Sequence, residues 1–308
     1  MARELIYTSA RKGLKPGTRG FCTVAHTRHM LPGTVRMLEG LSAYKGVYSG
    51  HDDRAACNPV AISHHRYMLS GQTVSVLSRV AFCGMDHTSR DNKLAHHLVL
   101  VAAECPSAGP AWLALQPDLF RETWTEGPQV IAEPYTIPAD GDCQPSGAAW
   151  EALTGDAGWA GVMANAFSCN SRCITYLVFE PGMLTLPLIA DSLSLLRPDQ
   201  RWQVTFNTYF TAPAPGMTCL WRCCLPDLPA VRDPRTLSNA LVIDLTRPLG
   251  APPPSDYVRL ARGELVAGES EPQQPAAATD DTQFIRLPNR HREQLRFKPS
   301  QSKGTRRP

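Results

Sequence analysis

Proline and glycine recur along the whole chain and limit how long any helix or strand can run. The 308 residues include 27 Pro and 22 Gly, and both residue types interrupt regular secondary structure. We therefore expect many short elements instead of long helices. Because 43% of the residues are hydrophobic, the chain can still bury a core sufficient for one large domain or two small ones.

The first half of the chain reads mainly as strands. Apolar runs bounded by turn residues are typical of strands, and here they cover residues 4–8, 20–26, 58–69, 73–83 and 94–104. The third and fourth runs flank Ser70-Gly71-Gln72, which predicts a hairpin. Helical spacing of apolar residues predicts helices over 33–45 and 109–116.

A stretch rich in Pro, Gly and Asp follows, over residues 118–147. It predicts a long loop, or a boundary between two lobes near 118–150. Beyond it we expect helices over 156–167 and 183–196, and strands over 173–179, 201–211, 217–225 and 239–245.

These patterns together predict an α+β fold. It would contain a mixed, largely antiparallel sheet or sheets with a few packing helices. A division into two lobes is an alternative to a single domain. We expect an ordered domain over 1–262. Residues 263–308 have the composition of a disordered linker followed by a basic tail.

The positive charge is unevenly placed along the chain. From residue 286 to 308, eight Lys/Arg accompany one Glu, a formal charge of +7, whereas residues 1–250 are neutral in sum. A neutral body is an unsuitable nucleic-acid platform, because phosphate neutralisation needs clustered cations. The tail could bind an acidic partner, RNA or an anionic membrane surface, or could remain solvated.

The chain also lacks the apolar segments that export or membrane insertion would need. No run approaches 18 apolar residues, and the N-terminus has no signal-like apolar stretch. Ten cysteines without export indicate reduced thiols. We therefore expect a cytoplasmic protein without a membrane span.

The densest polar group of side chains lies within residues 87–97. Its candidate ligand or partner contacts are Ser89, Arg90, Asn92, Lys93, His96 and His97. Hydroxyls and cations suit an anionic group, but neighbouring histidines on a strand point to opposite faces, so only one could join such a site. A hydrogen-bonded loop that holds a central strand is the alternative.

The cysteines offer only weak candidates for a metal site, namely Cys169, Cys173, Cys219 and Cys223. Their spacing differs from the CxxC knuckles of zinc sites, and free cysteine commonly packs as a small apolar residue. No motif identifies a catalytic residue or a cofactor site. The glycines of residues 154–161 indicate either close backbone approach to a ligand or small residues in a packed helix, with Asp156 as N-cap.

A partner surface is predicted along 201–211, if this segment is a strand. One face would carry Val204 and Phe206, and the other Asn207 and Tyr209, with Trp202 near the end. Aromatic anchors are typical of interaction hot spots. The alternative is that the helix expected over 183–196 covers this face.

Several long segments resemble one known family. They cover residues 4–27, 87–104, 153–162, 201–223 and 240–250. They are similar to the N-terminal domain, type two, of the bacterial GTPase-associated proteins, and they resemble planctomycete versions of it. The resemblance spans about residues 3–262.

The resemblance implies a non-catalytic interaction module. Such a module would act as an adaptor for a small GTPase encoded nearby, in a system of biological conflict. It supplies no catalytic residues that could be carried over to this chain. The alternative is a hydrolase or nucleotide-handling enzyme centred on the 87–97 cluster.

Overall fold

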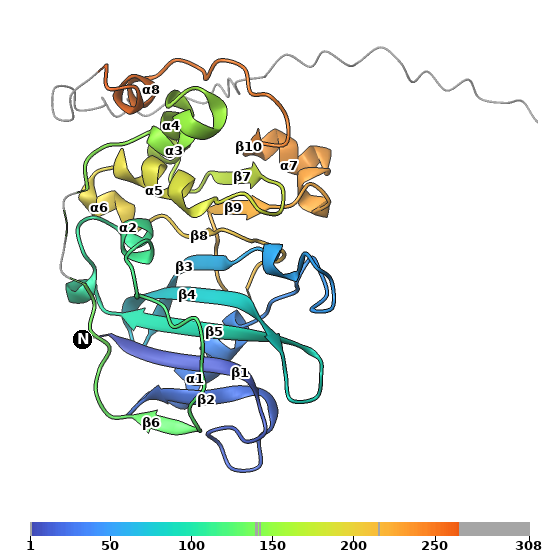
Figure 1. The fold of residues 1–308 in the computed structure, drawn as a ribbon. Helices are drawn as coiled ribbons and strands as arrows, with labels where there is room; N and C mark the ends of the chain where they lie inside the picture. Colours follow the sequence, from blue (N-terminus) through green and yellow to red (C-terminus); the bar gives the residue numbers. More distant parts are fainter. Residues whose placement is uncertain (1, 139–140, 142, 215, 265–308) are drawn as a thin grey trace, which may run out of the picture. The chain divides into compact units, whose positions relative to one another are not determined.

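The computed structural model describes residues 2–138, 141, 143–214 and 216–264 (Figure 1). The strands of these residues form one ten-stranded sheet in the order β10-β7-β9-β8-β3-β4-β5-β1-β2-β6. They are β1 (Arg3–Ala10), β2 (Gly20–Thr27), β3 (Ala61–Leu69), β4 (Gln72–Met85), β5 (Asp91–Leu100), β6 (Gln129–Ile131), β7 (Ile174–Val178), β8 (Phe206–Asn207), β9 (Trp221–Cys224) and β10 (Ala240–Asp244). The α+β class predicted from sequence is confirmed.

Helices are short, as the proline and glycine content predicts. They are α1 (Pro32–Leu41), α2 (Pro110–Ala114), α3 (Ala148–Thr154), α4 (Gly158–Cys169), α5 (Leu186–Ser194), α6 (Pro198–Arg201), α7 (Pro234–Asn239) and α8 (Asp256–Ala261), with 3-10 turns η1 (Ala55–Cys57), η2 (Ala102–Glu104) and η3 (Pro229–Val231). Five of these helices begin with a proline at one of the first two positions. Proline is well tolerated there because the first helical N–H groups have no intrahelical partner.

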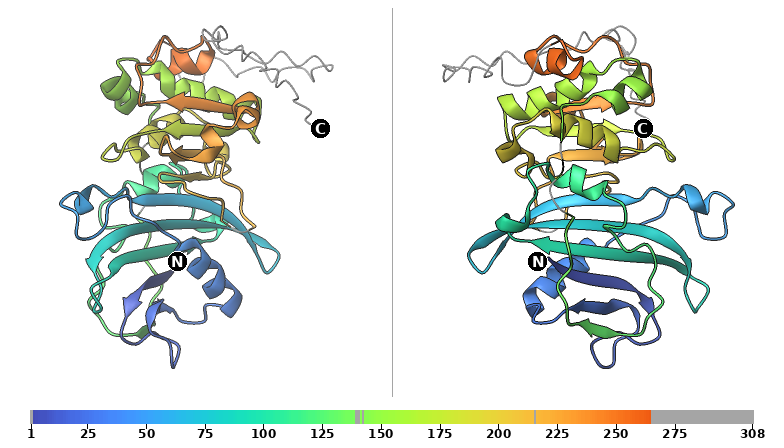
Figure 2. Two further views of the ribbon diagram at one scale, coloured as in Figure 1. Left: turned by 90° about the vertical axis from the view of Figure 1, so that its right-hand side faces the viewer. Right: turned by 60° about the vertical axis from the view of Figure 1, so that its left-hand side comes forward.

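The strands of the first half are antiparallel apart from β6, which pairs parallel to β2. The β3–β4 hairpin turns at Ser70 and Gly71, which have φ of 50° and 81°, so this prediction is confirmed. Helix α1 covers one face of the sheet through Leu38, beside Leu5 and Val99. The segment 118–137 crosses the opposite face (Figure 2).

The strands of the second half are parallel: β8, β9, β7 and β10 pair side by side. One face packs on α3, α4 and α5 around fully buried Trp150 and Trp221. The indole N–H of Trp150 donates to the Leu188 carbonyl at 2.9 Å. Parallel strands need covered faces, and segment 228–231 covers the other side.

The two halves join through the pairing of β3 with β8, where Ser63 faces Asn207 and His64 faces Phe206. Side chains reinforce this short pairing. The Thr208 hydroxyl donates to the Val60 carbonyl at 2.9 Å and accepts from the Ile62 N–H at 2.8 Å. Because this pairing crosses a sequence distance of about 145 residues, it depends on tertiary packing and not on local pattern.

The prediction of a strand over 201–211 is wrong for most of this segment. Only Phe206–Asn207 is a strand, and α6 ends at Arg201. Two members of the expected polar face are buried, since Thr205 is 5% and Tyr209 is 7% exposed. The Thr205 hydroxyl accepts from the Leu220 N–H at 3.0 Å, and the Tyr209 phenol donates to the Lys45 carbonyl at 2.9 Å, so both polar side chains bind neighbouring backbone.

A glycine contact holds α4 against α8. A Cβ atom added at Gly161 would overlap the backbone of Tyr257. We expect Gly161→Ala to lower the free energy of unfolding by about 1–3 kcal/mol, because overpacking forces backbone shifts. Urea denaturation measures this, and Gly40→Ala is the matched control because its Cβ would meet nothing within 4 Å. Equal losses in both variants would contradict the packing role of Gly161.

No helix among the described residues is long and apolar enough to cross a membrane. The predicted disordered linker and basic tail, apart from residues 263 and 264, lie outside the described residues.

Candidate functional site

The turn between β4 and β5 contains the first part of the predicted polar cluster. Asp86 organises this turn: its carboxylate accepts from the Thr88 hydroxyl at 2.6 Å and pairs with Arg90 at 3.2 Å. Hydrogen bonds from Thr88 and Ser9 lower the pKa of the Asp86 carboxyl. Ser89 has a positive φ of 59°. Arg90 and Ser89 thus form an ordered, exposed turn.

Asn92 and Lys93 belong to the start of β5 and contact β1. The Asn92 Oδ1 atom accepts from the Ser9 N–H at 3.1 Å and from the Thr8 hydroxyl at 3.3 Å. The Lys93 ammonium lies over the ring of Phe21, 5.0 Å from its centroid. These side chains tie β5 to β1, as the predicted loop that holds a central strand would do.

His96 and His97 lie on opposite faces of β5, and both are fully buried. The Nε2 atom of His97 lies 2.8 Å from the Ser42 hydroxyl oxygen, and its Nδ1 lies 2.7 Å from that of Ser78. Burial lowers the pKa of His97 to about 3. The structure therefore does not gather Ser89, Arg90, Asn92, Lys93 and either histidine into one pocket.

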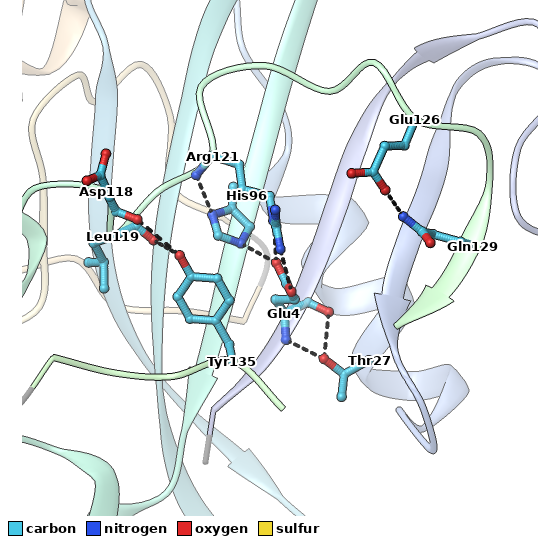
Figure 3. Close-up of polar contacts among 9 residues, drawn as sticks. All are labelled: Glu4, Thr27, His96, Asp118, Leu119, Arg121, Glu126, Gln129 and Tyr135. Carbon is cyan, nitrogen blue, oxygen red and sulfur yellow. Dashed lines mark hydrogen bonds and ion pairs between the residues drawn. The ribbon is translucent and has the colours of Figure 1, made fainter. Parts of the chain in front are cut away.

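His96 instead belongs to a buried ionic network with Glu4 and Arg121 (Figure 3). The Glu4 carboxylate, 1% exposed, lies 3.0 Å from His96 Nε2 and 2.9 Å from Arg121 Nε. The backbone N–H of Arg121 donates to His96 Nδ1 at 3.0 Å. Burial alone would raise the pKa of Glu4, but hydrogen bonds from His96 and Arg121 outweigh it and lower that pKa. Burial lowers the pKa of His96.

This network fastens segment 118–137 onto the sheet. The phenol of Tyr135 donates to the Leu119 carbonyl at 2.7 Å, and its ring lies beside the His96 ring at 5.4 Å. Figure 3 shows Tyr135 and Arg121 beside His96, and the Arg121 guanidinium carbon lies 5.8 Å from the Tyr135 ring centroid. The network thus joins Arg121 of this segment to Glu4 of β1 and His96 of β5.

Trp202, Asn207 and Tyr209 do not share one surface. The Trp202 indole N–H donates to the Pro106 carbonyl at 2.6 Å, which binds it to the loop before α2. Asn207 and Tyr209 instead line a cavity of about 120 Å³.

This cavity, which we call the junction cavity, lies where the two halves of the sheet meet. Its principal lining residues are Tyr44, Lys45, Ser63, His65, Asn207 and Tyr209. The rings of Tyr44 and Tyr209 meet edge to face with centroids 5.8 Å apart. Their phenols donate to the carbonyls of Pro59 and Lys45, at 2.7 and 2.9 Å. The aromatic walls are thus held rigidly.

His65 is a functional candidate that the sequence did not single out. It is 4% exposed and lines the cavity, and its Nδ1 has no hydrogen-bond partner among the described residues. Burial lowers the pKa of His65 to about 4, with a backbone hydrogen bond at Thr218 acting in the opposite direction. The imidazole is therefore neutral near pH 7, when it can give or accept one hydrogen bond.

His64, its neighbour, shows why the sequence offered no signal. It lies on the other strand face, with Nδ1 2.7 Å from the Val204 carbonyl oxygen and Nε2 3.1 Å from the Ser75 hydroxyl oxygen. Sequence alone indicates that one of two adjacent histidines faces inward. Only the packing shows that both histidines are buried. It also shows that both ring nitrogens of His64 have hydrogen-bond partners, unlike those of His65.

The four candidate metal-ligating cysteines are dispersed. Cys169 is exposed, Cys173 is half-buried, and Cys219 and Cys223 are buried. Burial raises the pKa of the Cys219 thiol to about 12, which disfavours the thiolate that metals bind. Within the described residues, no group of three or more His, Cys, Asp or Glu is placed to hold a metal ion.

The glycine-rich segment 154–161 combines a cap and a packed helix. The Asp156 carboxylate accepts from the Gly158 N–H at 2.8 Å, although the helix cap itself is Ala157. Arg262 pairs with Asp156 at 2.6 Å. This geometry matches the packing interpretation of the segment.

Two family models match the chain. The first is GTPase-associated protein 1, N-terminal domain type 2, over residues 1–137. The second is GTPase-associated protein 1, middle domain, over residues 148–247, so the resembling segments beyond residue 147 fall mainly within the middle domain. No curated protein and no solved structure matches the chain. The chain therefore belongs to the GTPase-associated protein 1 family, with an N-terminal domain of type 2 followed by a middle domain.

Proposed function

We propose that the protein is a non-catalytic adaptor for a small GTPase encoded nearby, within a bacterial system of biological conflict. The observation that carries this proposal is the junction cavity, which draws its lining from both matched domains. The family name supports a GTPase as the partner. A cytoplasmic location is part of the proposal.

The junction cavity has the properties of a socket for one side chain of the partner. Its volume of about 120 Å³ approaches that of cavities that hold benzene, about 150 Å³. A few anchors in well-packed pockets dominate protein interfaces, and rigid walls reduce the entropy lost on binding. We therefore assign the cavity to an apolar or aromatic anchor of the GTPase, with one hydrogen bond from His65, Ser63 or Asn207.

The first experiment captures the partner with the tagged full chain, in the presence of GTP or GDP analogues, and identifies it by mass spectrometry. The recovered GTPase is then titrated against Ala43→Phe, which places a ring at the exposed cavity edge without removing a contact. We expect at least tenfold weaker binding, because about 1.4 kcal/mol corresponds to a factor of ten.

Ala103→Phe is the matched control, since Ala103 is an exposed alanine in η2 outside the cavity. It should bind as the unmodified chain does. If Ala43→Phe also binds normally, the socket is not the contact, and capture of no GTPase by a folded chain contradicts the adaptor itself.

A further inference from the structure

The charge of the first strands is more segregated than the neutral sum over residues 1–250 indicates. Residues 5–38 contain no Asp or Glu and six cations, namely Arg11, Lys12, Lys15, Arg19, Arg28 and Arg36. Four of them lie between β1 and β2 and are all exposed; we call Arg11, Lys12, Lys15 and Arg19 the basic turn. Within the described residues, none of these four takes part in an ion pair.

The backbone of the basic turn is held in one conformation. The Gly13 N–H donates to the Thr18 carbonyl at 2.9 Å, and the Leu14 N–H donates to the Thr23 carbonyl at 2.8 Å. Gly17 has a φ of 82°, which favours glycine. The loop between β1 and β2, drawn in blue in Figure 1, therefore has a backbone fixed by hydrogen bonds at the positions of the four cations.

An aromatic platform adjoins the basic turn. The rings of Tyr7 and Phe21 are almost parallel, 9° apart, with centroids separated by 6.4 Å. Phe21 is 41% exposed. The Lys93 ammonium lies over both rings, 5.0 Å from the Phe21 centroid and 5.9 Å from the Tyr7 centroid.

The carboxylates of the neighbouring elements already have partners. Asp86 binds the Ser9 hydroxyl at 2.8 Å and Arg90 at 3.2 Å. Glu39 accepts from the Thr23 hydroxyl at 2.7 Å. The cations of the basic turn therefore remain available to an external anion.

We propose that the basic turn and the Tyr7–Phe21 platform bind single-stranded nucleic acid. The cations meet phosphates, and one base stacks on Phe21, displacing the Lys93 ammonium from the ring toward a phosphate. Proteins that bind single strands without sequence preference combine these two features, a positive surface and aromatic rings for stacking. The proposal goes beyond the adaptor function and is independent of it.

The combination favours nucleic acid over an acidic protein. A strand offers a phosphate and a flat base at every nucleotide, so it satisfies the cations and the exposed ring together. Carboxylates on a protein would satisfy the cations alone. The partner is thus recognised by charge and stacking, with weak dependence on base sequence.

Fluorescence anisotropy of labelled 20-nucleotide single-stranded RNA and DNA tests the proposal with the full chain. Phe21→Ala should weaken binding by about tenfold, because stacking contributes about 1–3 kcal/mol per base. Phe21→Trp should retain the affinity. Replacing Arg11, Lys12, Lys15 and Arg19 with Gln should make the dependence of log affinity on log salt shallower by about 3, as expected for four lost phosphate contacts.

The tail supplies a matched control of equal charge, with Arg290, Arg292, Arg296 and Lys298 replaced by Gln. If this variant loses as much affinity as the basic-turn variant and Phe21→Ala loses none, the tail is the binding site and the proposal is wrong. Unchanged circular dichroism and thermal midpoints establish that the exposed substitutions leave the fold intact.

Two rival partners give different results. Poly-glutamate that competes as well as the oligonucleotide, with no effect of Phe21→Ala, indicates an acidic protein instead. Co-sedimentation with phosphatidylserine vesicles, without binding to either oligonucleotide, indicates a membrane surface. Either outcome overturns the proposal, and neither bears on capture of the GTPase.

Discussion

Between pH 7 and about pH 5, the protein is expected to lose about 6 kcal/mol of its free energy of unfolding through three buried histidines. His64, His65 and His97 are at most 4% exposed, and burial lowers their pKa values to about 3, 4 and 3. In the unfolded chain each would titrate near 6.5. A loss of this size is comparable with the whole stability of a typical domain.

The sign follows from proton binding. As pH falls below about 6.5, the unfolded state takes up protons that the folded state binds only near pH 3–4, so stability falls with pH in that window. At about pH 5 each histidine contributes a loss of about 2 kcal/mol, from roughly 1.5 pH units at 1.36 kcal/mol per unit. The pKa of His96 is lowered too, which acts in the same direction.

Urea denaturation at pH 7, 6 and 5 measures this loss. His64→Gln should remove about 2 kcal/mol of the pH-dependent loss, because it removes one of the buried titrating groups. His51→Gln, at an exposed position, should leave the dependence unchanged. A midpoint that stays constant from pH 7 to 5 would show that these histidines can be protonated within the fold.

Arg121→Met is expected to lower the free energy of unfolding by about 3 kcal/mol at pH 7. The Glu4 carboxylate would remain buried with neutral His96 as its neighbour, and breaking a buried ion pair in this way costs about 3–5 kcal/mol. The lower end applies because the Arg121 side chain is 38% exposed, so water reaches that side of the pair.

A double-mutant cycle with Glu4→Gln separates the ion pair from the packing of Arg121. The double variant should be more stable than the sum of the two single losses implies, because the uncompensated charge is gone. Arg197→Met is the control, since Arg197 and Asp199 pair at 3.0 Å with both side chains over 60% exposed, and exposed pairs contribute at most about 1 kcal/mol. Simple additivity would argue against coupling between Glu4 and Arg121.

Acid should weaken the network of Glu4, His96 and Arg121 at a lower pH than the range of pH 7 to 5 in which the buried histidines act. The pKa of Glu4 is lowered in the folded state. Its stabilising contribution is therefore present above the unfolded pKa of about 4.3 and disappears as pH falls through the lower folded value. In Arg121→Met this acid-dependent part should shrink, because one of the two hydrogen-bond donors that lower the pKa is missing.

The local sequence pattern was sufficient to predict the elements whose partners are near in sequence. The β3–β4 hairpin needed only two apolar runs and a Ser70-Gly71 turn, and the strands β1, β2 and β5 followed from continuous or alternating apolar residues. The resemblance to the GTPase-associated proteins likewise rested on contiguous segments. Short-range hydrogen bonding and side-chain alternation act within a few residues, so the sequence shows them directly.

Segment 201–211 shows where pattern alone misleads. Its alternation fits a long strand, but Thr205 and Thr208 bond to the backbone of distant segments and Tyr209 lines the junction cavity. An alternating sequence shows which side chains are apolar. It does not show which neighbouring segments will bury the polar side chains. Tertiary packing therefore decided the length of β8 and the burial of Thr205 and Tyr209.

The basic turn was visible in the sequence, whereas the buried network depends on the tertiary structure. The run of cations without carboxylates can be seen in the sequence of residues 5–38. The neutral net charge of residues 1–250 concealed it. The pairing of Glu4 with Arg121 spans 117 residues, and the junction cavity joins residues from both domains. Chain composition and local periodicity by themselves determined the fold class and the short elements, while the resemblance to the family was carried by contiguous segments. The tertiary structure decided which distant polar groups meet, because burial and distance, which set their pKa values and contacts, exist only after the chain has folded.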